Sequence, residues 1–147
     1  MVEFFRFLFF IIAMIKIQLF LISILGALAV IAGAFSAHLL ERFVNQNIIT
    51  LRELSIFEKA VRYQMYHVIV LLSLCLLNLS KNYIIFYYSF ILIFLGIIFF
   101  SGSLYWISLQ NIISITYPRF LFWITPLGGF LMIFGWFWIF LEGKKMI

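Results

Sequence analysis

The sequence predicts an all-α, polytopic membrane protein with four antiparallel transmembrane helices and an amphipathic interfacial segment between the first two. Hydrophobic residues make up 67% of the 147 residues and charged residues only 10%, whereas about a quarter of a soluble domain is charged. Mean hydropathy is +1.22. There is no Asp, and all five acidic residues are Glu. This composition excludes a water-soluble enzyme, a disordered tail and a nucleic-acid-binding domain.

Four apolar runs are suited to cross the membrane, because a hydrocarbon core of about 30 Å needs roughly 20 helical residues. They are residues 17–37, 63–79, 83–109 and 120–141. Lys81 and Asn82 separate the second run from the third, and residues 111–119 separate the third from the fourth. Such short links make neighbouring helices antiparallel. Pro118 suits the first turn of the fourth helix, where its missing N–H is no loss.

Residues 1–16 are predicted to be an N-terminal extension or an interfacial segment, because Lys16 closes an apolar run that is too short to span. One interpretation starts translation at Met14. Another reads the first span as a cleavable signal peptide, although retention is favoured because the same region carries small residues suited to helix packing. Residues 17–141 then form the transmembrane domain, and residues 142–147 form a short basic tail.

The longest polar segment, residues 39–62, joins the first two spans. Thr50 with Glu53 and Ser55 with Glu58 each have the spacing of a capping box, in which hydroxyl and carboxylate bond free N–H groups reciprocally. Glu58 precedes Arg62 by four residues, the favourable order for a helical ion pair. We expect a helix that begins near Ser55, lies partly in the interface and continues into the second span.

Small residues recur on one face of the first span and within the fourth. Such positions let helix backbones approach closely, so tight helix packing is expected rather than a ligand-binding glycine loop. The predicted packing positions are Gly26, Ala29, Gly33, Ala37, Gly128, Gly129 and Gly135.

Polar residues within the spans gather near the ends that adjoin the long polar segment. Antiparallel folding should bring them into one leaflet, while the other leaflet offers little beyond Ser23, Asn78 and Ser89. Ionisable groups within a membrane indicate a functional site by default. Replacing Arg62 or His67 is therefore expected to impair accumulation more than replacing Asn78. The predicted cluster consists of His38, Arg62, Gln64, His67, Ser101, Ser103, Tyr105 and Thr125.

The chemistry of this cluster indicates no enzyme, and no metal or cofactor is expected. His38 and His67, predicted at similar depth, are the residues that would ligate a haem or metal, yet no carboxylate is expected at their depth. Ser101-Gly102-Ser103 lacks the surroundings of a nucleophile elbow. Pro126 interrupts the fourth span, which predicts a kink satisfied by a neighbouring hydroxyl.

The ten Lys and Arg residues against five Glu give a net charge of +5. Because the cations are scattered between apolar runs, they are expected to anchor the spans at lipid headgroups. The count is equal on the two sides, so orientation is undetermined, with both termini inside preferred. The expected partners are the lipid bilayer and a second copy or another membrane protein, with no nucleic acid.

Five ordered motifs resemble the YgdD/YwdK family of small bacterial inner-membrane proteins, a domain of unknown function (number 423) similar to the eukaryotic transmembrane-protein-256 proteins. They are Gly-Ala-Phe-Ser-Ala-His at 33–38, residues 57–67, Phe-Ser-Gly-Ser-Leu-Tyr at 100–105, Ile-Thr-Pro-Leu-Gly-Gly at 124–129 and Gly-Trp at 135–136. The family pattern has Gly where this chain has Ser36. The resemblance runs from about Met14 to Leu141. It implies a multi-pass protein of the bacterial plasma membrane and supplies no reaction.

Three functions remain open. The first is a non-catalytic structural or interaction protein, since the polar cluster is sized for bonds between helices. The alternative is a transporter or channel subunit for a small solute or proton. The third is a redox-linked membrane protein that binds haem through His38 and His67.

Overall fold

The computed structural model describes residues 2–81, 85–114 and 118–144. These residues form α1 (Val2–Phe35), the π-helical turn η1 (Ser36–Leu40), α2 (Glu41–Asn45), α3 (Leu51–Lys81), α4 (Tyr87–Ile113) and α5 (Leu121–Gly143). Lys81 ends α3, whereas Asn82 of the predicted tight turn lies outside the described residues. So do the start of the third span, part of the link at 111–119 and the end of the basic tail.

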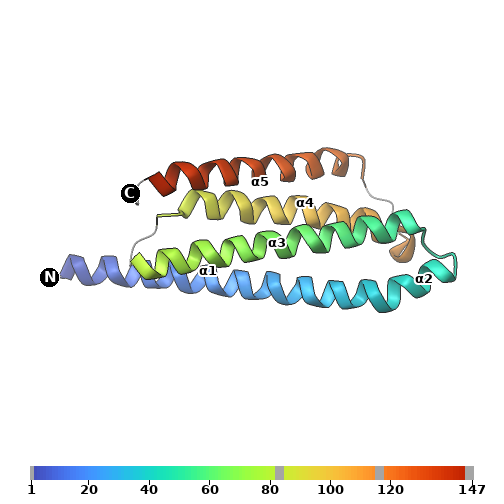
Figure 1. The fold of residues 1–147 in the computed structure, drawn as a ribbon, viewed down its shortest axis with the longest axis horizontal. Coiled ribbons are helices and arrows are strands. Elements are labelled where there is room, and N and C mark those ends of the chain that lie inside the picture. Colours follow the sequence, from blue (N-terminus) through green and yellow to red (C-terminus); the bar gives the residue numbers. More distant parts are fainter. Residues whose placement is uncertain (1, 82–84, 115–117, 145–147) are drawn as a thin grey trace.

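Among the residues that the structure describes, four helical segments are long and apolar enough to cross a membrane: Phe5–Asn45, Leu51–Ser80, Tyr87–Ile113 and Leu121–Gly143. The prediction of four spans is therefore confirmed. They run alternately up and down, and both described chain ends lie at the same end of the molecule (Figure 1). We call this the terminal end, and we call the opposite end, which carries the link between α2 and α3, the loop end.

The helices form an open series rather than a closed bundle. Close backbone approaches between these helices join α1 to α3, α3 to α4, and α4 to α5. Figure 1 shows this order, with α1 and α5 at opposite edges. Each edge helix thus leaves much of its surface uncovered by the rest of the chain.

Helix α1 begins at Val2 and runs through Lys16, where the sequence predicts a separate segment. No Pro or Gly precedes Lys16 to end the helix. Ile11 and Ile15 are buried against the apolar core. Residues preceding the predicted span therefore take part in packing, while translation from Met14 stays a prediction.

The capping box at Thr50 fixes the start of α3. The Thr50 N–H donates to Glu53 Oε2 at 2.7 Å, and the Glu53 N–H donates to Thr50 Oγ1 at 3.2 Å. The helix accordingly begins at Leu51, and the expected start near Ser55 is wrong because the earlier box already satisfies the free N–H groups. The expected ion pair is confirmed, with Arg62 3.6 Å from Glu58.

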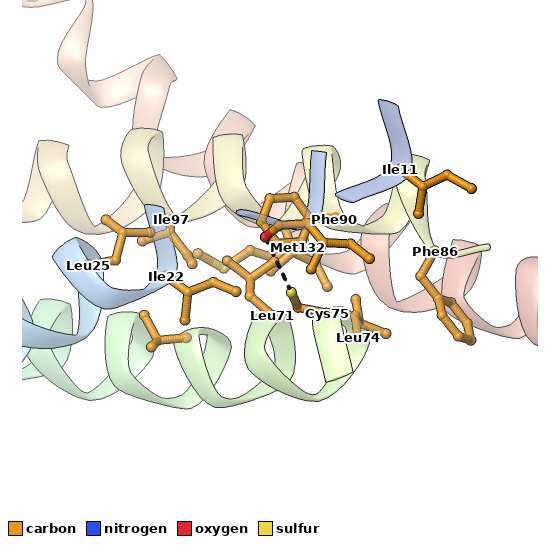
Figure 2. Packing of buried hydrophobic residues seen from close by; sticks show 13 residues of the cluster. Ile11, Ile22, Leu25, Leu71, Leu74, Cys75, Phe86, Phe90, Ile97 and Met132 are labelled. Atoms are coloured by element: carbon orange, nitrogen blue, oxygen red, sulfur yellow. Dashed lines mark hydrogen bonds between the residues drawn. The ribbon is translucent and has the colours of Figure 1, made fainter. Parts of the chain in front are cut away.

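An apolar core runs between all four spans. Ile22 of α1, Leu71 of α3, Ile97 of α4 and Met132 of α5 belong to one buried cluster (Figure 2). A smaller cluster at the loop end joins Leu40, Ile49 and Phe57 and holds η1 and the α2–α3 link against the spans.

The closest helix contact lies between α4 and α5. A Cβ added at Gly135 would come within 2.5 Å of Ile93, and one at Gly96 within 2.6 Å of Met132. A Cβ at Gly128 would overlap the backbone of Phe100. Gly96 was not among the predicted packing positions, because a lone Gly in a long apolar run gives no repeat.

The other predicted packing positions have looser surroundings. A Cβ at Gly26 or Gly33 would make ordinary contacts of 3.5–3.6 Å with Val68 and Val61. Gly129 has similar room beside the Phe100 ring. Ala29 is buried, whereas Ala37, which lies within η1, is exposed. The close backbone approach thus belongs to α4 and α5.

Candidate functional site

Gln64 is the centre of a hydrogen-bonded link across three helices. Its side chain is buried on α3, where Nε2 donates to the Leu25 carbonyl of α1 at 2.8 Å. The Tyr105 hydroxyl of α4 donates to Gln64 Oε1 at 2.8 Å. A buried amide is costly unless it is bonded, and here both ends of the amide have partners. This link fixes α1, α3 and α4 relative to one another.

Three hydroxyl groups join α4 to its neighbours. Ser101 Oγ donates to the Ala60 carbonyl of α3 at 3.0 Å. Ser103 Oγ lies 2.7 Å from Thr125 Oγ1 of α5. Thr125 Oγ1 also lies 3.3 Å from the carbonyl oxygen of Leu121, one turn earlier in α5, and Pro126 follows inside the same helix. These hydroxyls are engaged with protein groups, as expected for polar atoms within an apolar helix contact.

His67 bonds through both ring nitrogens. Its Nδ1 lies 2.8 Å from the Tyr63 carbonyl, and the Trp136 indole N–H of α5 donates to Nε2 at 3.3 Å. A carbonyl only accepts, so the proton is on Nδ1, and Nε2 accepts the indole N–H. This pattern uses a neutral imidazole as a link between α3 and α5.

His38 and Arg62 lie apart from the linked groups. Gly26 of α1 is level with Val68 of α3, the residue after His67, and His38 lies twelve residues beyond Gly26. That is about 18 Å along a helix axis. His38 therefore does not share the depth of His67, contrary to the expectation, and it is exposed in η1. The Arg62 side chain is 52% exposed and faces Glu58. Sequence position alone does not give the register between α1 and α3, which sets these depths.

A second polar contact between α3 and α4 lies at the loop end. Glu53 accepts from the Asn111 amide at 2.6 Å in addition to its bonds with Thr50. The sequence predicts Asn111 in a link, but it lies in the last turn of α4. The bond therefore joins the start of α3 to the end of α4.

The terminal end carries a buried carboxylate that the sequence interpretation missed. Glu142 is 2% exposed, although the sequence predicts it in the basic tail. Its oxygens accept from the N–H groups of Tyr88 and Ser89 at 3.1 and 3.2 Å and from the Ser89 hydroxyl. Glu142 thus caps the start of α4 from the end of α5, where a negative charge also complements the helix dipole.

Asn78 stabilises the chain that enters α4. It is fully buried, and its Oδ1 accepts from the N–H groups of Ile85 and Phe86 at 2.9 and 3.1 Å. These contacts indicate that replacing Asn78 is more damaging than replacing Arg62, which is the reverse of the expected ranking. The partners of Asn78 are backbone groups, which no side-chain motif reveals.

The polar side chains of the spans hold neighbouring helices together through these hydrogen bonds. Within residues 2–81, 85–114 and 118–144, no group of three or more His, Cys, Asp or Glu residues is placed to hold a metal ion. Ser101 bonds to a carbonyl of α3, and Ser103 bonds to a hydroxyl of α5.

Comparison with known proteins identifies the family. The family model described as a protein of unknown function (DUF423) matches residues 32–129. A UPF0382 membrane protein of Staphylococcus saprophyticus is 43% identical over 77% of this chain and 88% of its own length. One from Staphylococcus haemolyticus is 37% identical over 86% and 98%, respectively.

A more distant relative is described as an inner membrane protein. The UPF0382 inner membrane protein YgdD of Escherichia coli K12 is 30% identical over 82% of this chain and 84% of its own length. No solved structure matches. With four apolar spans and these relatives, the chain is a multi-pass membrane protein that belongs to the DUF423 family, as its motifs predicted.

Proposed function

We propose that the protein is a non-catalytic structural or interaction component of the plasma membrane. The observation that carries this proposal is the use of the polar groups. Gln64, His67 and Thr125 each bond to another span and leave no donor set converging on a common ligand. Polar groups in membrane proteins act in this way to hold helices together.

The open order of the helices supports the interaction role. Helix α5 packs closely against α4 and exposes large aromatic side chains on its other sides, including Trp123, Phe130 and Phe134. The partner proposed for this exposed face of α5 is a second copy of the chain or another membrane protein.

A transporter or channel subunit is the alternative, and one feature favours it. A polar hollow of about 400 Å³ at the loop end is lined by Thr50, Arg52 and Asn111 together with neighbouring residues. Toward the terminal end, however, Leu71, Ile93 and Ile97 fill the space between the helices. Apolar packing at that depth favours the interaction role over a solute pathway.

Haem binding has less support. His38 is exposed in η1, while His67 bonds to Tyr63 and Trp136 through its two nitrogens. Ligation by both histidines would require breaking at least one of these bonds and bringing two distant segments together.

Site-specific photocrosslinking in intact cells tests the proposal. Benzoyl-phenylalanine is placed at Phe134, whose side chain is 57% exposed, and at Phe90, which is 4% exposed. The proposal expects a discrete protein adduct from position 134 and none between chains from position 90. Lipid adducts alone from position 134, or proton or solute flux in liposomes that contain only this protein, would overturn it.

A further inference from the structure

An apolar groove lies between α1 and α4 and has α3 as its floor. Its volume is about 460 Å³. Leu28, Ile31 and Phe35 form the α1 wall, and Ile98, Gly102 and Leu109 form the α4 wall. The groove exists because α1 and α4 each approach α3 but do not approach each other. All these walls belong to membrane-spanning segments.

Gly102 extends the groove across α4. A Cβ added at Gly102 meets nothing within 4 Å. A second hollow, about 200 Å³ and bordered by α4 and α5, shares Ile98 and Gly102 with the groove. The two hollows therefore border the same part of α4, where position 102 has no side chain.

The polar groups that line the groove determine the chemistry of its occupant. Gln64 and Tyr105 line the groove, but they bond to each other and to the Leu25 carbonyl. An occupant consequently meets apolar walls and polar groups that already have partners. Hydrocarbon suits this lining because it requires no hydrogen bond.

The dimensions of the groove determine the shape of the occupant. Along α1 the wall extends from Leu25 to Phe35, about 15 Å at the rise of an α-helix. The cavity volume of about 460 Å³ along this open groove suits a slender chain that lies along it. A transmembrane helix, about 10–12 Å across with its side chains, could insert only side chains into it.

We propose that this groove is a binding site for one acyl chain of a membrane phospholipid, which is held there more firmly than the lipids around it. The proposal goes beyond the interaction role and does not depend on a protein partner. Because the contacts are with hydrocarbon, the site should select for the chain rather than for the headgroup.

Native mass spectrometry of the purified full chain tests the site, with dioleoyl-phosphatidylglycerol or dioleoyl-phosphatidylethanolamine added to the detergent micelles. Gly102→Leu fills the groove. Gly143→Leu is the matched control, because a Cβ at Gly143 also meets nothing within 4 Å but lies outside the groove. Neither substitution should unfold the chain, since Leu has a higher helix propensity than Gly.

The wild type and Gly143→Leu should retain a phospholipid of either headgroup, and Gly102→Leu should lose occupancy several-fold at an unchanged or higher melting temperature. Equal lipid occupancy in all three proteins would overturn the proposal. So would a wild-type dimer that Gly102→Leu converts to a monomer without any change in bound lipid, because the groove would then hold a second copy of the chain.

Discussion

The two ends of the molecule use buried polar groups in different ways. Toward the loop end, Gln64 and Tyr105 pair side chain to side chain across two helices. At the terminal end, Asn78 and Glu142 bond mainly to backbone N–H groups where α4 begins. The first arrangement sets the spacing of helices that already exist. The second completes the start of a helix, so its loss leaves several backbone donors without partners.

Replacing Glu142 with Leu should have the largest effect. It removes the acceptor for two backbone N–H groups and the Ser89 hydroxyl at a site that is 2% exposed. The expected loss of unfolding free energy is about 2–4 kcal/mol, because each buried donor left unpaired costs about 1–3 kcal/mol. Denaturant titration in detergent micelles measures it. Glu142→Gln, which keeps one acceptor oxygen, should lose less unfolding free energy. Equal stability of E142L and the wild type would show that the terminal end does not depend on this carboxylate.

Replacing Asn78 with Leu should have the next largest effect, about 1–3 kcal/mol. The substitution leaves the N–H groups of Ile85 and Phe86 without their acceptor. Arg62→Leu is the comparison, and it should cost less than about 1 kcal/mol because its ion pair is half exposed. If Arg62→Leu proved the more damaging in the same titration, the sequence-based ranking would be right and the structural one wrong.

Replacing Tyr105 with Phe should have the smallest effect. It removes one hydrogen bond to Gln64 Oε1 but keeps the ring that packs against Phe57. Bonds between spans contribute about 0.6 kcal/mol on average, so the expected loss is of that size. Comparing Y105F, Q64L and the double variant gives the coupling energy between the two side chains. A coupling energy larger than the effect of Glu142→Leu would mean that the Gln64–Tyr105 pair contributes more to stability than Glu142, contrary to the expected order.

Much of the fold follows from hydropathy. The four spans and their alternation are predictable, because a lipid-exposed backbone must be helical and short links force neighbours to be antiparallel. The Thr50–Glu53 capping box is readable as a local pattern, although Ser55 and Glu58 offered the same pattern and the wrong start. Local patterns thus give two candidate starts, and the helix uses the earlier one because its box already satisfies the free N–H groups.

The candidate site was only partly predictable, for a physical reason. Gln64, Tyr105, Ser103 and Thr125 are polar residues inside apolar runs, so their pairing follows from the need to satisfy buried polar groups. His38 required knowledge of the register between α1 and α3. Glu142 required knowing that α5 continues to Gly143 beside the start of α4. Neither the register nor the continuation appears in residue composition.

Hydrogen exchange in detergent micelles, resolved to the amides of Tyr88 and Ser89, tests most directly whether Glu142 holds the start of α4. The account predicts that Glu142→Leu sharply increases exchange at these two amides while the amides around Gln64 stay protected. Unchanged protection at Tyr88 and Ser89 in this variant would contradict it.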